Sequence, residues 1–511
     1  MKCEAHDLLL TIEPTVLYNE NKKRCKRASV CEERKRMYKY LFFDDQKLLQ
    51  RAGLERVYGK PELVKDSVYY DGHTSTDFPT SYIFRTEDGK YRLLYQGHDV
   101  DGKMHCYMAA SDDGLHFEPV DLTNVLPLEN RIANNEIMPI AGEIGTIIED
   151  NINSPSERYK MLLTQGPDRE HHLWIDGPLL TSPDLFHWTV VEGVRWNMGN
   201  EPVVGAFYNK FKGCFTILQR PWWGDRRVGY VETKDWRHFT PFELCMQCDS
   251  LDAPLDEVYG MPAMEYEGRY IGFPLIYSDF TSTNMVKFND GTIKPQLAYS
   301  WDGNHWQRSL RTPFIDGMTE ECEEAFGWKC YLVWLLSAMQ VDSGDVRFYA
   351  ATSGYEHGPA FKTMGRGRIG VWQIKRDRFI GLTTKSADVC GVLDTRENIW
   401  DSGEAHVNIS AKKATLAVYE VRDEAMWSMP FLIEGYSHEE CVPFSGDSTD
   451  WVPVFKNGKK LDELRGKTIM LEIKIEDGTV YSISGDFTPI MNTEGVRYRQ
   501  LNGIRPKRVI I

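Results

Sequence analysis

Four acidic residues stand at the start of β-rich runs that lie far apart in the sequence. They are Asp77 before TSYIFR, Glu143 before IGTIIE, Glu201 before PVVGAFYN, and Glu257 in DEVYGMP. A carboxyl group acts as a general acid when it is protonated and as a general base or nucleophile when it is ionised. Because carboxyl groups held close together take different pKa values, one pair can supply both roles near neutral pH. These residues are therefore the first candidates for catalysis.

A second candidate group is the segment RPWWGDRR at residues 220–227, which combines two adjacent tryptophans with three arginines. Sugar C–H faces stack on indole rings, and a guanidinium donates paired hydrogen bonds to oxygen atoms. The residues that we expect to contact a ligand are Arg220, Trp222, Trp223 and Arg226, with Trp196 and Tyr259 as further candidates. The alternative is that the two tryptophans pack between structural units.

The elements that must position these residues follow a repeat. The pattern Ser/Thr-x-Asp-x-x-His-Phe/Trp occurs as SDDGLHF from Ser111, SPDLFHW from Ser182, TKDWRHF from Thr233 and SWDGNHW from Ser300. The starts are 71, 51 and 67 residues apart, and recurrence on this scale is typical of repeat architectures. We expect a β-turn in which the Asp caps its own backbone and the aromatic residue re-enters a sheet.

A β-rich run with a hairpin signal precedes each copy of the pattern. The runs are DGKYRLLYQG, SERYKMLLTQG, FKGCFTILQRP and YEGRYIGFPLIY, and a fifth, GWKCYLVWLLS at 327–337, is followed by a degenerate copy. Five such units predict an all-β fold in which residues 61–382 form a five-bladed β-propeller. A sandwich or a β-helix is the rival architecture.

The segments on either side of the repeat have different sequence patterns. Residues 1–60 are charged and mixed, and we expect them to form an extension that wraps over a propeller edge. After residue 382 the chain changes to short alternating runs, such as HVNISAKKATLAVYEV and KTIMLEIKIEDGTVYSIS. Alternation of this kind without a helical period predicts a C-terminal β-sandwich over residues 383–511.

The blade order, the turns and the C-terminal β-rich part resemble the five-bladed glycoside hydrolases of the fructofuranosidase (family 32) and arabinofuranosidase (family 43) clans. The resemblance covers roughly residues 60–511. It implies that Asp77 is the nucleophile, that Glu201 in GNEPVVGAFYN is the general acid and that Glu143 is the third acidic residue. Gln96 in YRLLYQG matches a glutamine that follows the first-blade strand of the family, and the resemblance implies that it binds the substrate.

A propeller explains why such residues would meet. The inner strands of all blades start around one axis, so acidic residues ahead of them face one funnel. Glycosidic cleavage needs a carboxylic acid that protonates the leaving oxygen and a carboxylate that attacks or activates water. Asp71 is the nearest substitute for Asp77, and Glu257 opens the fourth blade as Glu201 opens the third.

We therefore expect a glycoside hydrolase that acts on a small oligosaccharide, with a fructoside or arabinoside slightly preferred because the resembling clans favour furanosides. A glycoside phosphorylase is an alternative, since it needs one carboxylic acid and a basic phosphate cluster, for which Arg220, Arg226 and Arg227 are available. A non-catalytic carbohydrate-binding propeller is the other alternative, because folds host many functions.

Composition disfavours several other partners. The formal net charge is −15 and no long basic run occurs, which argues against nucleic acid and anionic membranes. No apolar segment has the length of a membrane span or a signal sequence. The 11 cysteines are odd in number and lack framework spacing, which suits a reducing compartment. We expect a cytoplasmic protein, and self-association is left open.

No cofactor or metal ion is expected. Cys245 and Cys248 form a tight pair in CMQC, but a zinc site would need a second pair at ligand spacing. The repeated histidines cannot converge because each belongs to a different blade; they are His116, His187, His238 and His305. An ion on the propeller axis remains an open alternative.

Overall fold

The computed structural model describes residues 38–73, 80–98, 103–127, 129, 131–140, 142–168, 173–194, 196, 201–221, 225–279, 290–360, 365–424 and 427–490. This part of the chain is mostly β-structure, and its α-helices are the short α1 (Glu320–Phe326) and α2 (His357–Ala360). The predicted all-β class is confirmed. Neither helix has the length and hydropathy that crossing a membrane requires, a finding that concerns the described residues alone.

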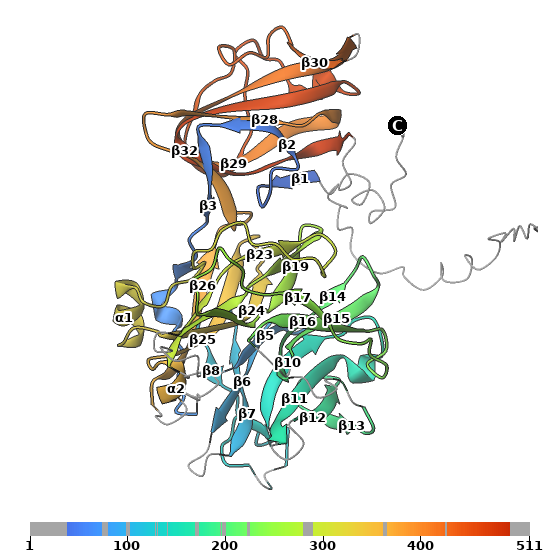
Figure 1. Ribbon diagram of the computed structural model, residues 1–511, viewed down its shortest axis with the longest axis vertical. Coiled ribbons are helices and arrows are strands. Elements are labelled where there is room, and N and C mark those ends of the chain that lie inside the picture. Colours follow the sequence, from blue (N-terminus) through green and yellow to red (C-terminus); the bar gives the residue numbers. More distant parts are fainter. Residues whose placement is uncertain are drawn as a thin grey trace, which may run out of the picture. The chain divides into compact units, whose positions relative to one another are not determined.

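The sheets between residues 62 and 374 follow one another in chain order around a propeller-like ring (Figure 1). The first sheet contains β5 (Ser81–Arg85), β6 (Tyr91–His98), β7 (Met104–Ser111), β8 (Glu118–Pro119) and β9 (Glu136–Pro139). The second contains β10 (Glu143–Glu149), β11 (Tyr159–Asp168), β12 (Leu173–Ser182) and β13 (Thr189–Val191). The third contains β14 (Glu201–Asn209), β15 (Cys214–Arg220), β16 (Val228–Thr233) and β17 (Glu243–Met246).

The remaining sheets of the ring are less regular. One contains β19 (Ala263–Tyr266), β20 (Arg269–Gly272) and β23 (Ala298–Ser300). The last contains β24 (Leu332–Gln340), β25 (Val346–Ser353), β26 (Gly367–Ile374) and β4 (Glu62–Leu63), and β22 (Gly291–Pro295) connects β18 (Asp256–Gly260) and β21 (Leu275–Asp279) to it. The strand β4 precedes the first sheet in the chain, so strands from both ends of the segment complete this sheet.

The first strands of the sheets are neighbours around the ring. The strand β10 contacts β14, β14 contacts β19, β19 contacts β24, and β24 contacts β5. The first and second sheets are joined where the Tyr82 hydroxyl donates to the Gly145 carbonyl at 2.9 Å. We call the end of the ring at which β10 and β14 begin the mouth.

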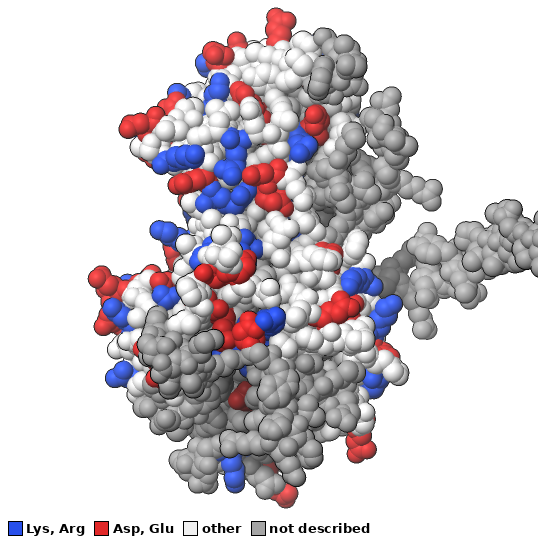
Figure 2. Space-filling model, viewed as in Figure 1, with Lys and Arg blue, Asp and Glu red and all other residues white. Residues whose placement is uncertain are grey.

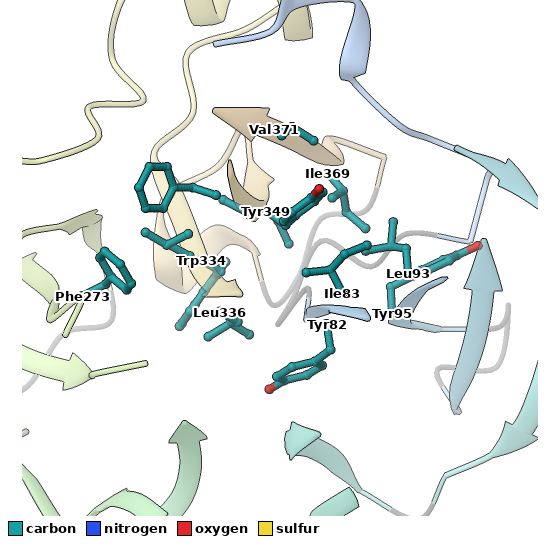
Figure 3. Packing of buried hydrophobic residues seen from close by; sticks show 14 of the residues in the cluster. Tyr82, Ile83, Leu93, Tyr95, Phe273, Trp334, Leu336, Tyr349, Ile369 and Val371 are labelled. Carbon is teal, nitrogen blue, oxygen red and sulfur yellow. The ribbon is translucent and has the colours of Figure 1, made fainter. Parts of the chain in front are cut away.

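The largest hydrophobic cluster joins the first sheet to the last (Figure 3). Ile83 and Leu93 of the first sheet face Tyr349 and Ile369 of the last, all of them buried. Burial of a large apolar side chain stabilises a fold by about 1.5–3 kcal/mol. The core therefore lies between the sheets and fixes their mutual orientation.

Each copy of the repeated pattern forms the predicted Asp-capped turn. In all four, one carboxylate oxygen of the Asp accepts from two following backbone amides, and the other lies 2.6–2.8 Å from the His Nδ1. The Ser or Thr hydroxyl accepts from the amide three residues on, at 2.9 Å. That residue has a positive φ whether it is glycine or not; the four are Gly114, Leu185, Trp236 and Gly303.

Three of the turns are held by the sheet that precedes them around the ring. The Tyr349 hydroxyl of the last sheet donates to Gly114 O at 3.0 Å. Trp236 Nε1 donates to Asp150 Oδ2, beside the second sheet, at 2.9 Å. Asn209 Nδ2 of the third sheet donates to Asp302 O at 2.7 Å. The turns thus act as docking points between neighbouring sheets.

The C-terminal part forms one nine-stranded sheet rather than two separately ordered sheets of a sandwich (Figure 1). Its strands are β1 (Tyr38–Leu41), β2 (Leu48–Ala52), β3 (Leu54–Tyr58), β27 (Ile380–Thr384), β28 (Cys390–Thr395), β29 (Asn398–Glu424), β30 (Trp427–Leu432), β31 (Phe444–Trp451) and β32 (Thr468–Pro489). Asn398 pairs with both Ile469 and Pro489, near opposite ends of β32, so the sheet curls back on itself.

This sheet changes the expected domain boundaries. Residues 38–58, predicted to wrap over a propeller edge, instead supply strands to the C-terminal sheet, where Tyr40 and Leu54 join its core. The strand β27, which spans the predicted boundary at 382, also belongs to the C-terminal sheet. Alternation along a strand identifies a buried face but does not identify its pairing partner, which explains both differences.

A polar junction links the ring to the C-terminal sheet. Asp377, with φ of 65°, is buried and accepts from Lys39 Nζ at 2.9 Å, Tyr266 Oη at 2.8 Å and Ser482 Oγ at 3.2 Å. Next to it, Arg378 pairs with Asp447. Figure 2 shows acidic and basic residues interspersed over the visible face, as such pairs require.

Candidate active site at the mouth of the ring

Tyr259 of β18 is the point at which side chains from different sheets meet. The guanidinium carbon of Arg220, at the end of β15, lies 4.2 Å from the centre of its ring. His357 Nε2 lies 3.0 Å from its hydroxyl, and the Trp334 ring of β24 packs edge-on at 4.9 Å. Tyr259, Trp334 and His357 are all buried. Residues distant in sequence therefore converge on one phenol.

Charged groups near Tyr259 have opposite effects on the pKa of its hydroxyl. Burial raises the pKa of the Tyr259 hydroxyl, the guanidinium groups of Arg220 and Arg226 oppose this rise, and Glu143 adds to it. The carboxylate of Glu143 is thus within electrostatic range of the phenol. We call Glu143, Arg220, Arg226, Glu257, Tyr259, Tyr277, Trp334 and His357 the Tyr259 cluster.

Glu257 does not occupy the position of a free general acid. It lies in β18, which pairs with β21 rather than opening a sheet of the ring. Its carboxylate accepts from Arg226 Nη1 at 2.5 Å and from the Arg226 backbone amide at 3.1 Å. Arg226 is in turn positioned over the Tyr277 ring at 4.7 Å. Glu257 therefore holds Arg226 in place within the cluster.

Glu143 is the first residue of β10, at the mouth. The next residue, Ile144, donates its amide to Gln96 Oε1 at 2.9 Å, and the register of β10 shifts between Ile144 and Thr146. Such a bulge re-aims neighbouring side chains and is common beside active sites. Gln96 is 1% exposed, so it anchors the start of the Glu143 strand instead of contacting substrate as expected.

Four predicted site residues have no described side chain. Asp77, Trp222 and Trp223 lie outside the described residues. Glu201 opens β14 directly opposite Arg220, and its side chain is outside the described part.

Trp196 is placed in the core and not in an open site. It is fully buried among Leu162, Leu179 and Phe215, and its indole nitrogen donates to Gly177 O at 2.9 Å. A tryptophan with no exposed surface and a satisfied nitrogen packs as a structural residue. The sequence could not separate this role from substrate stacking because both use a large aromatic ring.

Asp71, the substitute for Asp77, belongs to a separate hydrogen-bonded network. Its carboxylate accepts from the Tyr95 hydroxyl, from Asn135 Nδ2 at 2.9 Å and from the His73 amide at 2.9 Å. Burial and the nearby Asp71 carboxylate raise the pKa of Tyr69. Burial, the Tyr69 hydroxyl and the Asp71 carboxylate raise the pKa of Tyr95. These donors tie Asp71 to β6, through Tyr95, and to Asn135.

Sequence reasoning missed His357, Tyr277 and Trp334. The available signal for His357 was the failure of the repeated turn after the fifth run, where VRFYAATSGYEHGP replaces it. In the structure that altered segment places His357 in α2 against Tyr259. Tyr277 and Trp334 gave no signal, since aromatic residues in strands are ordinary core residues.

The CMQC pair lies away from the mouth. Cys245 lines a groove of about 790 Å³ between β17 and residues 304–311, with Trp306 and Arg308 on the other wall. Burial raises the pKa of both Cys245 and Cys248 to about 12, so both thiols are protonated. Within the described residues, no three His, Cys, Asp or Glu side chains are grouped so that they could hold a metal ion.

Comparison with known proteins gives low-identity likenesses. No protein-family model matches the chain, and no curated protein matches it. Solved structures that are similar include a glycosyl hydrolase from Bacteroides ovatus, at 15% identity over 62% of this chain and 94% of that chain, with a TM-score of 0.41. A thermostable family-43 glycoside hydrolase is similar at 11% identity over 65% of this chain and 97% of that chain, with a TM-score of 0.40.

Another similar structure comes from work on a family of mannoside phosphorylases that contains β-1,2-mannoside hydrolases. It matches at 16% identity over 62% of this chain and 94% of that chain, with a TM-score of 0.39. All three similar structures are described as glycoside hydrolases or come from such work, and each is 16% identical to this chain or less. Likenesses this distant do not identify a substrate.

Proposed function

We propose that this protein is a glycoside hydrolase with a five-bladed propeller whose reaction takes place at the Tyr259 cluster. The observation that carries the proposal is the convergence on Tyr259 of Arg220 from the third sheet, Trp334 from the last and His357 from α2, with Glu143 of the second sheet in electrostatic range. Carboxylates, guanidinium groups and aromatic rings are the groups that recognise and cleave sugars.

The proposed roles of the carboxylates follow the family resemblance. Glu201 protonates the leaving oxygen, Asp77 is the nucleophile, and Glu143 holds sugar hydroxyls and tunes the acid. Glu143 and Glu201 are the first residues of β10 and β14, and these two strands are in contact, which supports roles for both residues at one site. We further propose that the substrate is a furanoside, such as a fructoside or an arabinoside, and that the protein is cytoplasmic.

The contacts of the arginines favour water over phosphate as the acceptor. A phosphorylase would need Arg220, Arg226 and Arg227 as a basic cluster. Arg226 is paired with Glu257 and Arg227 with Asp225, so two of the three already have carboxylate partners. A phosphate ion would have to displace or coexist with those carboxylates.

Turnover of a panel of aryl furanosides and pyranosides, with and without inorganic phosphate, tests the proposal. Release of the aryl group without phosphate, and at a rate that phosphate leaves unchanged, is the expected result. Turnover that requires phosphate would instead identify the phosphorylase. Ligand binding without any turnover would favour the non-catalytic alternative.

A further inference from the structure

A ladder of alternating aromatic rings and arginines lies beside the mouth, between the last sheet and the segment that leads into the first. The Arg368 guanidinium carbon lies 3.5 Å from the centre of the Tyr70 ring and 4.8 Å from that of Trp328. The Arg366 guanidinium carbon lies 5.0 Å from the Tyr355 ring and 6.0 Å from Trp328. Two cations thus share three aromatic rings.

In the part of the chain that the structure describes, Arg366 and Arg368 differ from most other arginines in having no carboxylate partner. Among the described residues no carboxylate lies within ion-pair distance of Arg366 or Arg368, and Arg368 Nη1 donates to Gly367 O at 2.7 Å. Burial lowers the pKa of Arg368, and the Tyr70 hydroxyl is what opposes that effect. The chain has a net charge of −15, yet among the described residues these two neighbouring guanidinium groups contact aromatic rings instead of a carboxylate.

Trp328, which both arginines share, packs closely against the backbone at Gly354. A Cβ atom on Gly354 would lie 2.5 Å from Trp328 Cδ1, so only glycine lets the indole lie against the backbone there. A guanidinium stacked on an aromatic ring keeps its plane fixed, and its hydrogen-bond donors point outward in that plane. Arg368, which is half-buried and lies 3.5 Å from the centre of the Tyr70 ring, is the more restrained of the two, whereas Arg366 is exposed.

The ladder adjoins the proposed active site through the chain itself. Tyr355 is two residues before His357, so their Cα atoms are at most about 7.6 Å apart. Tyr70 immediately precedes Asp71, whose network supports the start of the first sheet. A sugar bound at the Tyr259 cluster would have the ladder as a neighbour.

We propose that Arg366 and Arg368 bind the carboxylate of an acidic sugar residue, so that the substrate is a uronic-acid-containing oligosaccharide. A planar carboxylate matches the fork of a guanidinium, and the rings offer apolar faces to the sugar. This inference rests on the proposed function for its connection to catalysis, but the binding that it describes is independent of turnover.

The test is calorimetric binding of a short uronate-containing oligosaccharide and of its carboxyl-reduced, neutral counterpart to the full chain. The wild type is expected to prefer the uronate by roughly 10- to 100-fold, as a charge-assisted hydrogen bond allows. Arg366→Met and Arg368→Met, singly and together, should reduce this preference and leave the affinity for the neutral sugar unchanged. Arg422→Met is the matched control, since Arg422 is an arginine stacked on Phe431 in the C-terminal sheet.

Three results would overturn the proposal: equal binding of the two sugars by the wild type, a preference that survives in the folded double variant, and inorganic phosphate binding to the pair as tightly as the uronate. Its failure is distinguishable from failure of the proposed function. Hydrolysis of neutral and acidic substrates alike, with no effect of the variants, would remove the ladder proposal only. Uronate binding that depends on Arg368, without any hydrolysis, would remove the hydrolase proposal only.

Discussion

The outer Asp-capped turns and the Tyr259 cluster are assembled in opposite ways. Each turn is built from seven consecutive residues, and all four copies repeat the same hydrogen bonds. The Tyr259 cluster draws on residues from 143 to 357, and these residues come from several sheets and from α2. The turns are thus determined locally, whereas the cluster exists only when the ring has closed.

This difference separates stability from activity. A change within a turn should alter stability and leave the chemistry intact, because the turns lie outside the mouth. A change within the cluster should alter the chemistry with a smaller effect on stability.

Lys160→Met should cause the largest loss of stability. Lys160 pairs with Asp150, and Asp150 in turn joins the second sheet to the turn that contains Trp236. Lys160 and Asp150 are fully buried with their charged atoms 3.4 Å apart, and Asp150 also accepts from Trp236. Removal of one partner leaves a buried carboxylate uncompensated, which costs about 3 kcal/mol. Denaturant unfolding measures the loss.

The double variant Lys160→Met with Asp150→Asn is the control for that experiment. It should recover part of the stability, because a neutral pair leaves no unpaired charge. If the double variant were less stable than the sum of the two single changes, the buried pair would not be the cause.

Tyr259→Phe should reduce kcat/KM about tenfold, as loss of one hydrogen-bonding group in the site predicts. The ring and its contact with Trp334 remain, while the bond to His357 is lost. Tyr230→Phe is the matched control, since it removes a hydroxyl that donates to Glu243 in the outer strand β17, away from the mouth. Steady-state kinetics compares the two variants, and equal loss in both would contradict the separation.

Asp235→Ala should lower the free energy of unfolding by about 1–2 kcal/mol while kcat stays unchanged. The carboxylate caps the amides of Arg237 and His238, and loss of a cap of this kind costs that amount. Thermal unfolding and turnover of the same preparation provide the measurements. A large loss of turnover in a variant that is still fully folded would show that the turns influence the site.

The smallest expected effect is a shift in the titration of His116. Its hydrogen bonds to Asp113 and then to Asp66 raise the pKa of the imidazole. A raised folded-state pKa means that the pair stabilises the fold at pH values below the unfolded pKa and loses that contribution as pH rises through the folded pKa. NMR titration should show a higher pKa for His116 in the wild type than in Asp113→Asn, and no difference would contradict the pairing.

The sequence was informative where structure depends on neighbouring residues. The Asp113, Asp184, Asp235 and Asp302 caps follow from local turn chemistry, and they are present as predicted. The pairing of residues 38–58 with β28 and β32 could not be predicted, because an alternating run does not specify its partner.

The candidate site shows the same limit. Arg220, Arg226 and Tyr259 were predicted as lining residues and are found together. Gln96, Trp196 and Glu257 were predicted from residue type and position but are engaged in anchoring, packing and ion pairing. Residue type indicates which chemistry a side chain can perform. Its contacts in the folded protein decide whether it can contact a substrate.

The most direct test of the central claim is turnover of the best aryl glycoside by the wild type, Glu201→Gln, Glu143→Gln and Glu149→Gln. Glu149 is the matched control because it ends the strand that Glu143 begins and is paired with Arg158. The account predicts that Glu201→Gln reduces kcat by about 100- to 10,000-fold, that Glu143→Gln also lowers it, and that Glu149→Gln does not. Wild-type turnover that both mouth variants retain in full would contradict it.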